Sequence, residues 1–250
     1  MENSFSARFI RSIDANRTVK DALTVAVGAG RKRSRVSVTD LVNPMQAFYR
    51  WTRPEIRPSL DRLQLMMEGT GFHDVFGRAV STEEFLEQLL ELDGITGKVD
   101  IYEDVPVEVK TTSAIPADIY KGRSSYFEQL GMYCAMAGNK TGRLFVYQRQ
   151  TPEQPGDLKV YEAVFSDLEK VVRDMRKRRD VFQVALERND PSGLPRCEWM
   201  YRGCDYSGIC PCRNVSPIPP VVSREEVDIS ERDELVETLK DKLFSAPRSE

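Results

Sequence analysis

Periodic patterns of apolar residues predict alternating helices and strands along the 250-residue chain. Apolar positions at helical spacing favour helices, and apolar residues at every second position between turn signals favour strands. The expected elements are a short helix within 36–53, a helix over 60–80 interrupted near Gly69 and Gly71, strands over 84–92, 96–102 and 105–111, a helix over 124–138, strands over 143–149 and 159–165, and a helix over 167–186. This order predicts an α/β protein whose mixed central sheet is flanked by helices.

Composition divides the chain into three parts. Residues 1–35 form a basic lead-in, with eight basic and three acidic side chains. Residues 36–215 hold the predicted sheet and helices and form the main domain. In 216–250 a proline-rich linker precedes a charged terminal helix, which Ser230 and Asp233 are expected to cap.

The overall composition is that of a folded, cytoplasmic protein. Hydrophobic residues make up 40% of the chain, which is enough for an ordinary core. No apolar run approaches the ~18 residues that a membrane span needs, so we expect no membrane partner. The net charge of −3 does not exclude a nucleic acid, because binding depends on local positive surface, and the lead-in is basic.

The acidic stretch 97–110 carries the candidate catalytic residues. A hairpin that turns about Asp104 would set Asp100 opposite Glu108. Two such carboxylates repel each other unless a cation lies between them, and hard oxygen ligands suit Mg²⁺ or Mn²⁺. Lys110 shares a face with Glu108, where its ammonium could orient water or stabilise charge on a phosphate. The pattern indicates metal-assisted phosphodiester hydrolysis; the alternative is a solvent-exposed hairpin face.

Three residues outside the hairpin extend this pattern. His73 is the only histidine of the chain. Gln129 and Tyr133 lie four positions apart and therefore share one face of the helix that follows the hairpin. A lone histidine is more often a polar surface or core residue than a ligand, and Gln129 with Tyr133 alone could be an ordinary helix face. Together with the hairpin they form a defined set.

Four motifs in this order resemble those of the RecB-like branch of the PD-(D/E)XK nuclease superfamily, over about residues 36–212. The motifs are Gly-x-Gly-x-His ending at His73, Gly-x-x-Asp ending at Asp100, Glu-x-Lys from Glu108 to Lys110, and Gln-x-x-x-Tyr from Gln129 to Tyr133. The resemblance implies a restriction-endonuclease-like fold and a divalent metal cofactor, Mg²⁺ or Mn²⁺.

The resemblance also implies a role for each matched residue. Lys110 would be the catalytic lysine, and Gln129 and Tyr133 would position that lysine or the nucleic acid. The implied metal ligands are His73, Asp100, Glu108 and the backbone carbonyl of Val109.

Four of the five cysteines are clustered near the C-terminal end of the main domain. They are Cys197, Cys204, Cys210 and Cys212. In a reducing compartment such a cluster favours metal binding over disulfides, and four thiolates can hold a [4Fe-4S] cluster or one Zn²⁺ ion. The sequence therefore predicts a C-terminal cysteine metal-binding segment. The fifth cysteine, Cys134, is expected to be a buried hydrophobic residue.

Within the RecB-like branch, the chain resembles the iron-sulfur exonucleases associated with CRISPR spacer acquisition. Residues 38–44 look like the Thr-Asp-Leu element of that family, and 204–210 look like its last cysteine pair. Asn43 and Tyr201 stand where the family has cysteines, and the other two clustered cysteines are near enough to replace them. This likeness favours a [4Fe-4S] cluster, with Zn²⁺ as the alternative.

We therefore expect a metal-dependent DNA exonuclease that acts on single-stranded ends, with a role in CRISPR spacer acquisition and antiviral defence. CRISPR integration proteins or a helicase are the candidate partners. A recombination or repair nuclease is one alternative, and a non-catalytic DNA-binding adaptor is another. Tyr49 and Trp51 could stack on unpaired bases or bury their helix against the core.

Overall fold

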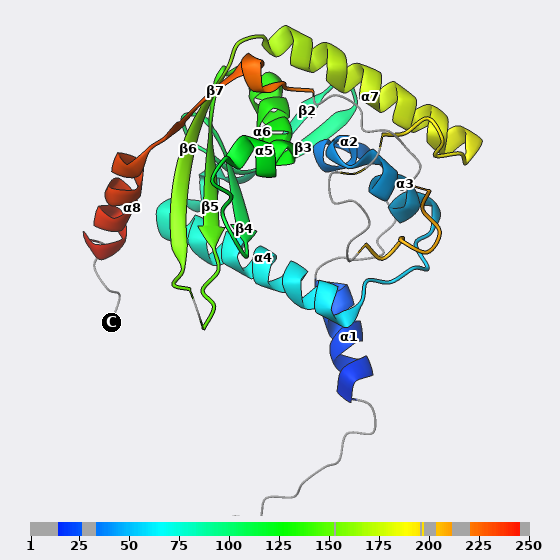
Figure 1. Cartoon of the computed structure of the whole chain (residues 1–250), viewed down its shortest axis with the longest axis horizontal. Coiled ribbons are helices and arrows are strands. Elements are labelled where there is room, and N and C mark those ends of the chain that lie inside the picture. Colours follow the sequence, from blue (N-terminus) through cyan, green and yellow to red (C-terminus); the bar gives the residue numbers. More distant parts are fainter. Residues whose placement is uncertain are drawn as a thin grey trace, which may run out of the picture.

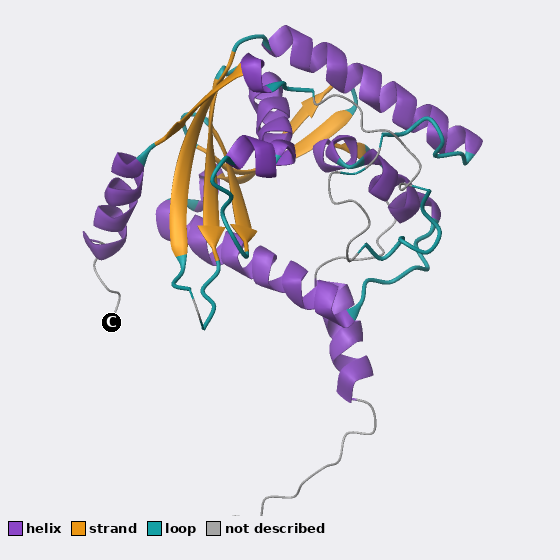
Figure 2. Ribbon diagram, in the orientation of Figure 1, coloured by secondary structure: helices purple, strands orange, loops and turns teal. Residues whose placement is uncertain are grey.

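Seven strands of the computed structural model form one mixed sheet with helices on both faces (Figure 1, Figure 2). The structure describes residues 15–26, 34–152, 154–195, 197, 204–211 and 221–245. Within these ranges the expected α/β architecture, a mixed central sheet flanked by helices, is confirmed.

The sheet is mixed because it contains both parallel and antiparallel strand pairs. Its strands are β1 (Val36–Ser37), β2 (Leu86–Leu92), β3 (Ile95–Tyr102), β4 (Pro106–Thr112), β5 (Thr141–Gln148), β6 (Asp157–Phe165) and β7 (Val227–Glu231). The strand order is β1-β3-β4-β5-β6-β7, and β2 pairs with β3 outside this path. β1 with β3 and β4 with β5 are parallel, and the other pairs are antiparallel.

The helices form a layer on each face of the sheet (Figure 1). The helices are α1 (Ala15–Ala26), α2 (Val38–Val42), α3 (Pro44–Thr52), α4 (Leu60–Val80), α5 (Ile119–Gly122), α6 (Ser124–Ala137), α7 (Leu168–Arg188) and α8 (Asp233–Ser245), with short 3₁₀ turns at Glu83–Phe85 and Arg224–Glu226. α6 packs on β4 and β5, and α7 covers α6 on its outer side. α4 lies across the opposite face, where it also contacts α8.

Each face of the sheet has its own hydrophobic core. The larger core includes Phe127 and Leu130 of α6 and lies between that helix and the sheet. The smaller core joins Val107 and Val109 of β4 to Phe76 of α4 and its neighbours. Because strand side chains alternate, the residues of β4 between these valines point toward α6 instead.

Capping residues explain where several helices begin and end. Ser59 Oγ accepts the backbone N–H of Arg62 at 3.3 Å at the start of α4. The Asp167 carboxylate accepts the backbone N–H of Lys170 at 2.8 Å at the start of α7. α6 ends at Gly138, whose φ of +67° is a left-handed conformation that glycine adopts without steric cost.

Two expectations for the elements are wrong. α4 runs without interruption through Gly69 and Gly71. A helical glycine weakens a helix without breaking its hydrogen-bond ladder, and the packing of the α4 aromatic residues stabilises it here. Ser230 does not cap the terminal helix. It belongs to β7, where it pairs with Glu162 of β6, and α8 begins at Asp233. The sequence pattern predicted neither β7 nor β1.

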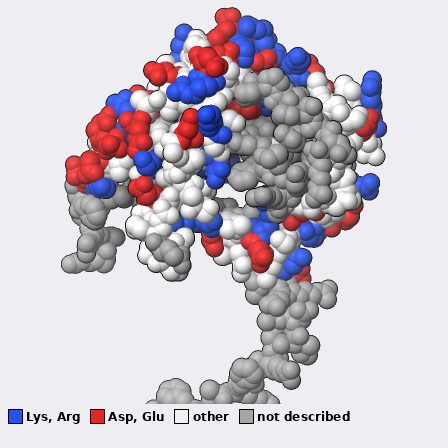
Figure 3. Space-filling view, viewed as in Figure 1, with Lys and Arg blue, Asp and Glu red and all other residues white. Residues whose placement is uncertain are grey.

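The basic lead-in is described only in part. It contains α1, while residues 1–14 and 27–33 lie outside the described ranges. On the face of the molecule shown in Figure 3, acidic and basic side chains are interspersed. Within the described ranges, no helix has the length and apolar composition needed to cross a bilayer.

Candidate metal and catalytic centre

The candidate centre lies at a bend in β2 and β3. At this bend the side chains of β3 change the face of the sheet toward which they point. Val99 belongs to the core beneath α6, whereas Ile101, two residues later, belongs to the core beneath α4. A straight strand would place both on one face, so β3 turns over at Asp100. Across from it in β2, Glu87 has a φ of +51°, a left-handed conformation that strains a residue with a Cβ. The register skips both Glu87 and Asp100.

The predicted hairpin register is confirmed only beside the turn. β3 and β4 pair Ile101 with Val107 and Tyr102 with Pro106. This register turns about Asp104 as expected, but the pairing stops before Asp100 would face Glu108. Instead, Asp100 Oδ2 accepts the backbone N–H of Val109 at 2.8 Å. The carboxylate thus takes the place of a backbone acceptor where the two strands separate.

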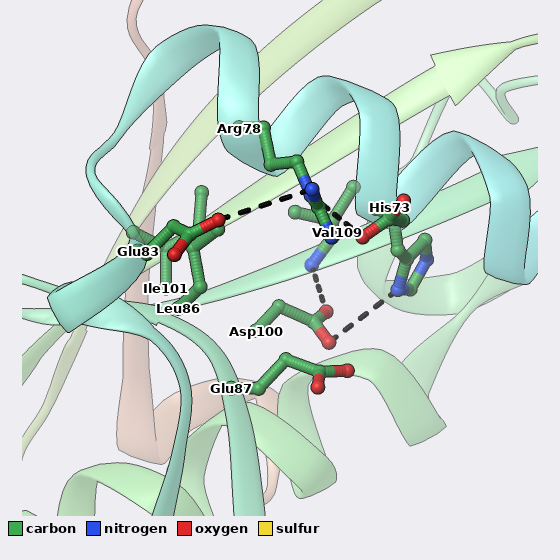
Figure 4. A pocket seen from close by; sticks show the side chains of 9 residues that line it. His73, Arg78, Glu83, Leu86, Glu87, Asp100, Ile101 and Val109 are labelled. Carbon is green, nitrogen blue, oxygen red and sulfur yellow. Dashed lines mark hydrogen bonds and ion pairs between the residues drawn. The ribbon is translucent and has the colours of Figure 1, made fainter.

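The second contact of Asp100 is His73 of α4. His73 Nδ1 lies 3.4 Å from Asp100 Oδ1, and Figure 4 shows the carboxylate between His73 and Val109. Burial alone would raise the pKa of Asp100, but His73, Lys110 and the Val109 N–H together lower it below its usual value. Asp100 is therefore ionised at neutral pH.

Asp100 and His73 open into a solvent-accessible pocket on the α4 side of the sheet (Figure 4). The pocket has a volume of about 310 Å³. Arg78, on its wall, forms ion pairs with Asp74 at 3.0 Å and Glu83 at 3.9 Å. Glu87 also lines it. A small ion therefore has access to Asp100 from solvent.

Glu108 is buried where β4 faces α6, close enough to Asp100 for the two charges to interact. Its residue exposure is 2%, and one of its oxygens, Oε1, is ion-paired with Lys110. Burial and the negative charge of Asp100 raise the pKa of Glu108 to about 7. Its other oxygen, Oε2, is buried and accepts no hydrogen bond from any described residue. Leaving a buried carboxylate oxygen without a donor is costly, so this oxygen suits a cation.

Gln129 connects the centre to α6. Its side-chain oxygen accepts from Lys110 Nζ at 3.0 Å. Its Nε2 donates to Glu108 Oε1 at 2.8 Å and to the Tyr133 hydroxyl at 3.0 Å. Burial and the charge of Glu108 raise the pKa of Tyr133 well above its usual value, so the hydroxyl stays neutral. The structure therefore brings Gln129 and Tyr133 to Glu108 and Lys110.

Lys110, whose side chain is half-buried, keeps its positive charge. Burial alone would lower the pKa of the ammonium, but the nearby carboxylates of Glu108 and Asp100 outweigh it and raise the pKa. Because Asp100 contributes to the pKa of both Glu108 and Lys110, the three charged groups form one electrostatic unit.

Gly97 of the Gly-x-x-Asp motif has a packing role beside this unit. A Cβ at this position would lie 2.9 Å from Tyr133 Cε1 and 3.0 Å from Met136 Sδ. Real Cβ atoms essentially never approach so closely, so only glycine lets the Tyr133 ring pack against β3.

The donor set fits a divalent metal, although the described residues are not arranged as a preformed site. No three His, Cys, Asp or Glu side chains in the described ranges lie close enough to share an ion. Instead, cationic or polar groups contact each carboxylate, Lys110 on Glu108 and His73 on Asp100. The fit rests on hard oxygen donors and on the buried Oε2 of Glu108, which has no donor.

The structure describes the cysteine segment only in part. Cys197, Cys204 and Cys210 are half-buried against the larger core, whereas Cys212 and Tyr201 lie outside the described residues. Asn43, at the position where the resemblance implies a cysteine, is the N-cap residue of α3, which begins at Pro44. Cys134 is fully buried in α6, as expected.

Tyr49 holds the cysteine segment against α3. Its hydroxyl donates to the carbonyl of Ile209 at 3.2 Å, and its ring stacks on Tyr206 with centroids 5.7 Å apart. Trp51 packs edge-on against Phe182 with centroids 5.9 Å apart. Both rings are therefore engaged in packing within the protein.

Comparison with known proteins shows the fold alone. No protein-family model and no curated protein sequence matches the chain. The crystal structure of SSO0001 is similar to it with a TM-score of 0.52 and 19% sequence identity, covering 81% of this chain and 98% of that one. An alkaline exonuclease from Laribacter hongkongensis, LHK-Exo, aligns with a TM-score of 0.39 and 15% identity over 68% of this chain and 93% of its own. This chain thus shares its mixed α/β fold with SSO0001.

Proposed function

We propose that this protein is a metal-dependent nuclease that hydrolyses phosphodiester bonds of DNA. One observation carries the proposal: Glu108, 2% exposed, has one oxygen without a donor while Lys110 and Gln129 hold the other. A buried carboxylate kept in this state, in electrostatic contact with an ionised Asp100, is suited to a divalent cation.

Each residue of the centre has a part in this chemistry. Mg²⁺ or Mn²⁺ would be held by Asp100 and Glu108 once their side chains close on the ion, with His73 and the Val109 carbonyl as further ligands, and would supply charge stabilisation and an acidified water. The Lys110 ammonium stabilises charge that develops on the phosphate. Gln129 and Tyr133 hold Glu108 and Lys110 in place through their hydrogen bonds.

The proposal extends to the substrate and the biological setting. We propose exonuclease action on single-stranded DNA ends during CRISPR spacer acquisition, with integration proteins as partners, on the strength of the family likeness of residues 38–44 and 204–210. A recombination or repair nuclease working with a helicase is the alternative. Linear and circular single strands are compared first, because an exonuclease spares the circle. Linear single strands are then compared with blunt duplexes, which tests the preference for single strands. Cleavage confined to duplex DNA would contradict the single-strand preference.

Paired substitutions test the nuclease proposal. Asp100→Asn and Lys110→Met should each abolish Mn²⁺-dependent cleavage, because each removes a charge from the centre. Asp104→Asn and Lys98→Met are matched controls, since both residues are exposed and ion-paired outside the centre. Cleavage by Asp100→Asn at the wild-type rate would overturn the proposal. DNA binding by the wild type without metal-stimulated cleavage would instead support the non-catalytic adaptor.

We further propose that Cys197, Cys204, Cys210 and Cys212 bind a [4Fe-4S] cluster, with Zn²⁺ as the alternative. The support is the four-cysteine spacing and the position of the first three against the larger core. Because binding free energy at such a site is also folding free energy, the metal would fasten this segment to the domain. Iron and sulfide in anaerobically purified protein support the cluster, and stoichiometric zinc supports the alternative.

A further inference from the structure

An aromatic ring outside the motif set lies against the Lys110 ammonium. Lys110 Nζ is 5.6 Å from the centroid of the Tyr126 ring. Tyr126 is 6% exposed and belongs to the first turn of α6, three residues before Gln129. The i, i+3 spacing places both residues on the same side of the helix, facing β4.

The ring and the hydrogen-bonding groups hold the ammonium in different ways. An ammonium has three N–H donors, and Glu108 and Gln129 each accept one. Among the described residues no acceptor takes the third. The face of a ring attracts a cation through its quadrupole and accepts no conventional hydrogen bond, so it restrains Lys110 while that donor stays available.

We propose that Tyr126 is a positioning residue that holds the Lys110 ammonium in place and keeps one of its N–H donors available for the phosphate. The inference rests on the proposed nuclease function for the identity of the substrate. Its structural part concerns Lys110 alone and can be tested without a substrate.

The competing role for Tyr126 is packing, because the ring also belongs to the larger core. Ring electrostatics separates the two roles. Tyr126→Phe keeps the ring and loses only a hydroxyl that makes no hydrogen bond to the described residues. Replacing Tyr126 with 3,4,5-trifluorophenylalanine keeps nearly the same shape and withdraws negative charge from the ring face. Packing predicts equal behaviour of these two proteins, whereas cation attraction predicts a difference.

The kinetic test compares these variants on a DNA substrate with Mn²⁺. We expect Tyr126→Phe to keep nearly the wild-type kcat. We expect kcat to fall about tenfold in Tyr126→Leu and by a smaller factor in the trifluorinated variant, with KM unchanged. Equal kcat values for the phenylalanine and trifluorophenylalanine proteins would overturn the inference, even if Tyr126→Leu misfolds.

A second measurement separates this inference from the nuclease proposal. Reductive methylation of the metal-free protein at one fixed pH, followed by mass spectrometry, reports how firmly the Lys110 amine is held. Lys110 should react faster in the trifluorinated variant than in Tyr126→Phe, while the exposed Lys98 reacts equally in both. Equal Lys110 rates would overturn the inference. Faster labelling in a protein that never cleaves DNA would support it while the nuclease proposal fails.

Discussion

Asp100 accepts the backbone N–H of Val109 at 2.8 Å, at the point where β3 and β4 stop pairing. The Asp100 side chain here takes the role of a backbone acceptor. Because Val109 is only 1% exposed, water cannot easily replace the carboxylate as acceptor for the Val109 N–H. The same carboxylate that faces His73 therefore also ties the two strands together. Substitutions of Asp100 should consequently affect stability and the proposed activity separately.

Two substitutions of Asp100 separate its structural role from its charge. Asp100→Asn keeps a side-chain oxygen for the Val109 N–H and loses only the charge, so it should be destabilised less than Asp100→Ala. Asp100→Ala leaves that buried N–H without an acceptor and should lose about 1–3 kcal/mol. Urea unfolding of the metal-free proteins measures both. Equal stability of the two variants would show that the hydrogen bond does not support the hairpin.

The raised pKa of Glu108 predicts a pH-dependent stability of the metal-free protein. Because the folded-state pKa is about 7 and the usual value is 4.5, the folded state holds this proton more tightly than the unfolded state. The stabilisation is complete below pH 4.5 and is lost as the pH rises through 7. The expected loss is roughly 3 kcal/mol.

Glu108→Gln provides the reference for that measurement, because it lacks the titrating carboxylate. The wild type should lose stability relative to Glu108→Gln between pH 4.5 and 7, as measured by urea unfolding across this range. Mg²⁺ should raise the wild-type thermal midpoint more at pH 8 than at pH 5.5, since a cation binds the ionised carboxylate. Parallel pH profiles for the two proteins would contradict the raised pKa.

Two glycines of the motif set should respond in opposite directions to alanine. Gly97→Ala forces the new methyl group against Tyr133 and Met136. The protein should lose stability, and the hydrogen bond between Tyr133 and Gln129 should weaken. Gly71→Ala adds a methyl group with nothing within 4 Å inside α4 and should stabilise the protein by about 0.5–1 kcal/mol. Thermal unfolding measures the stability of both variants. Destabilisation by Gly71→Ala would show that this glycine serves more than the helix.

The cysteines should divide into one structural and several metal-binding residues. Cys204→Ala and Cys210→Ala should lose bound metal and make the segment 204–211 more sensitive to protease, because the metal fastens it to the domain. Cys134→Ala is the matched control, since this thiol is buried inside α6 and burial raises its pKa. It should keep the metal and lose only packing energy. Metal analysis combined with limited proteolysis tests this prediction. Full metal content in Cys204→Ala would contradict the assignment of Cys204 as a metal ligand.

Local patterns predicted most of the elements that carry the site. The spacing of apolar residues located α4, α6 and the strands of the hairpin to within about two residues, because each buries one face against the core. The turn at Asp104 predicted the register of Ile101 with Val107. β7 was missed because it is a short edge strand whose pairing with β6 depends on a partner distant in sequence.

The sequence by itself determined the kinds of chemical group in the centre, their order along the chain and the faces of β4 and α6 that carry them, because strand alternation and helical spacing are local properties. Only the tertiary structure decided that β3 bends at Asp100, that Asp100 bonds to Val109 instead of pairing opposite Glu108, and that the Tyr126 ring meets Lys110. These relationships depend on where the sheet bends and on which helix packs over it. Such positions follow from packing between distant segments, which no local pattern records.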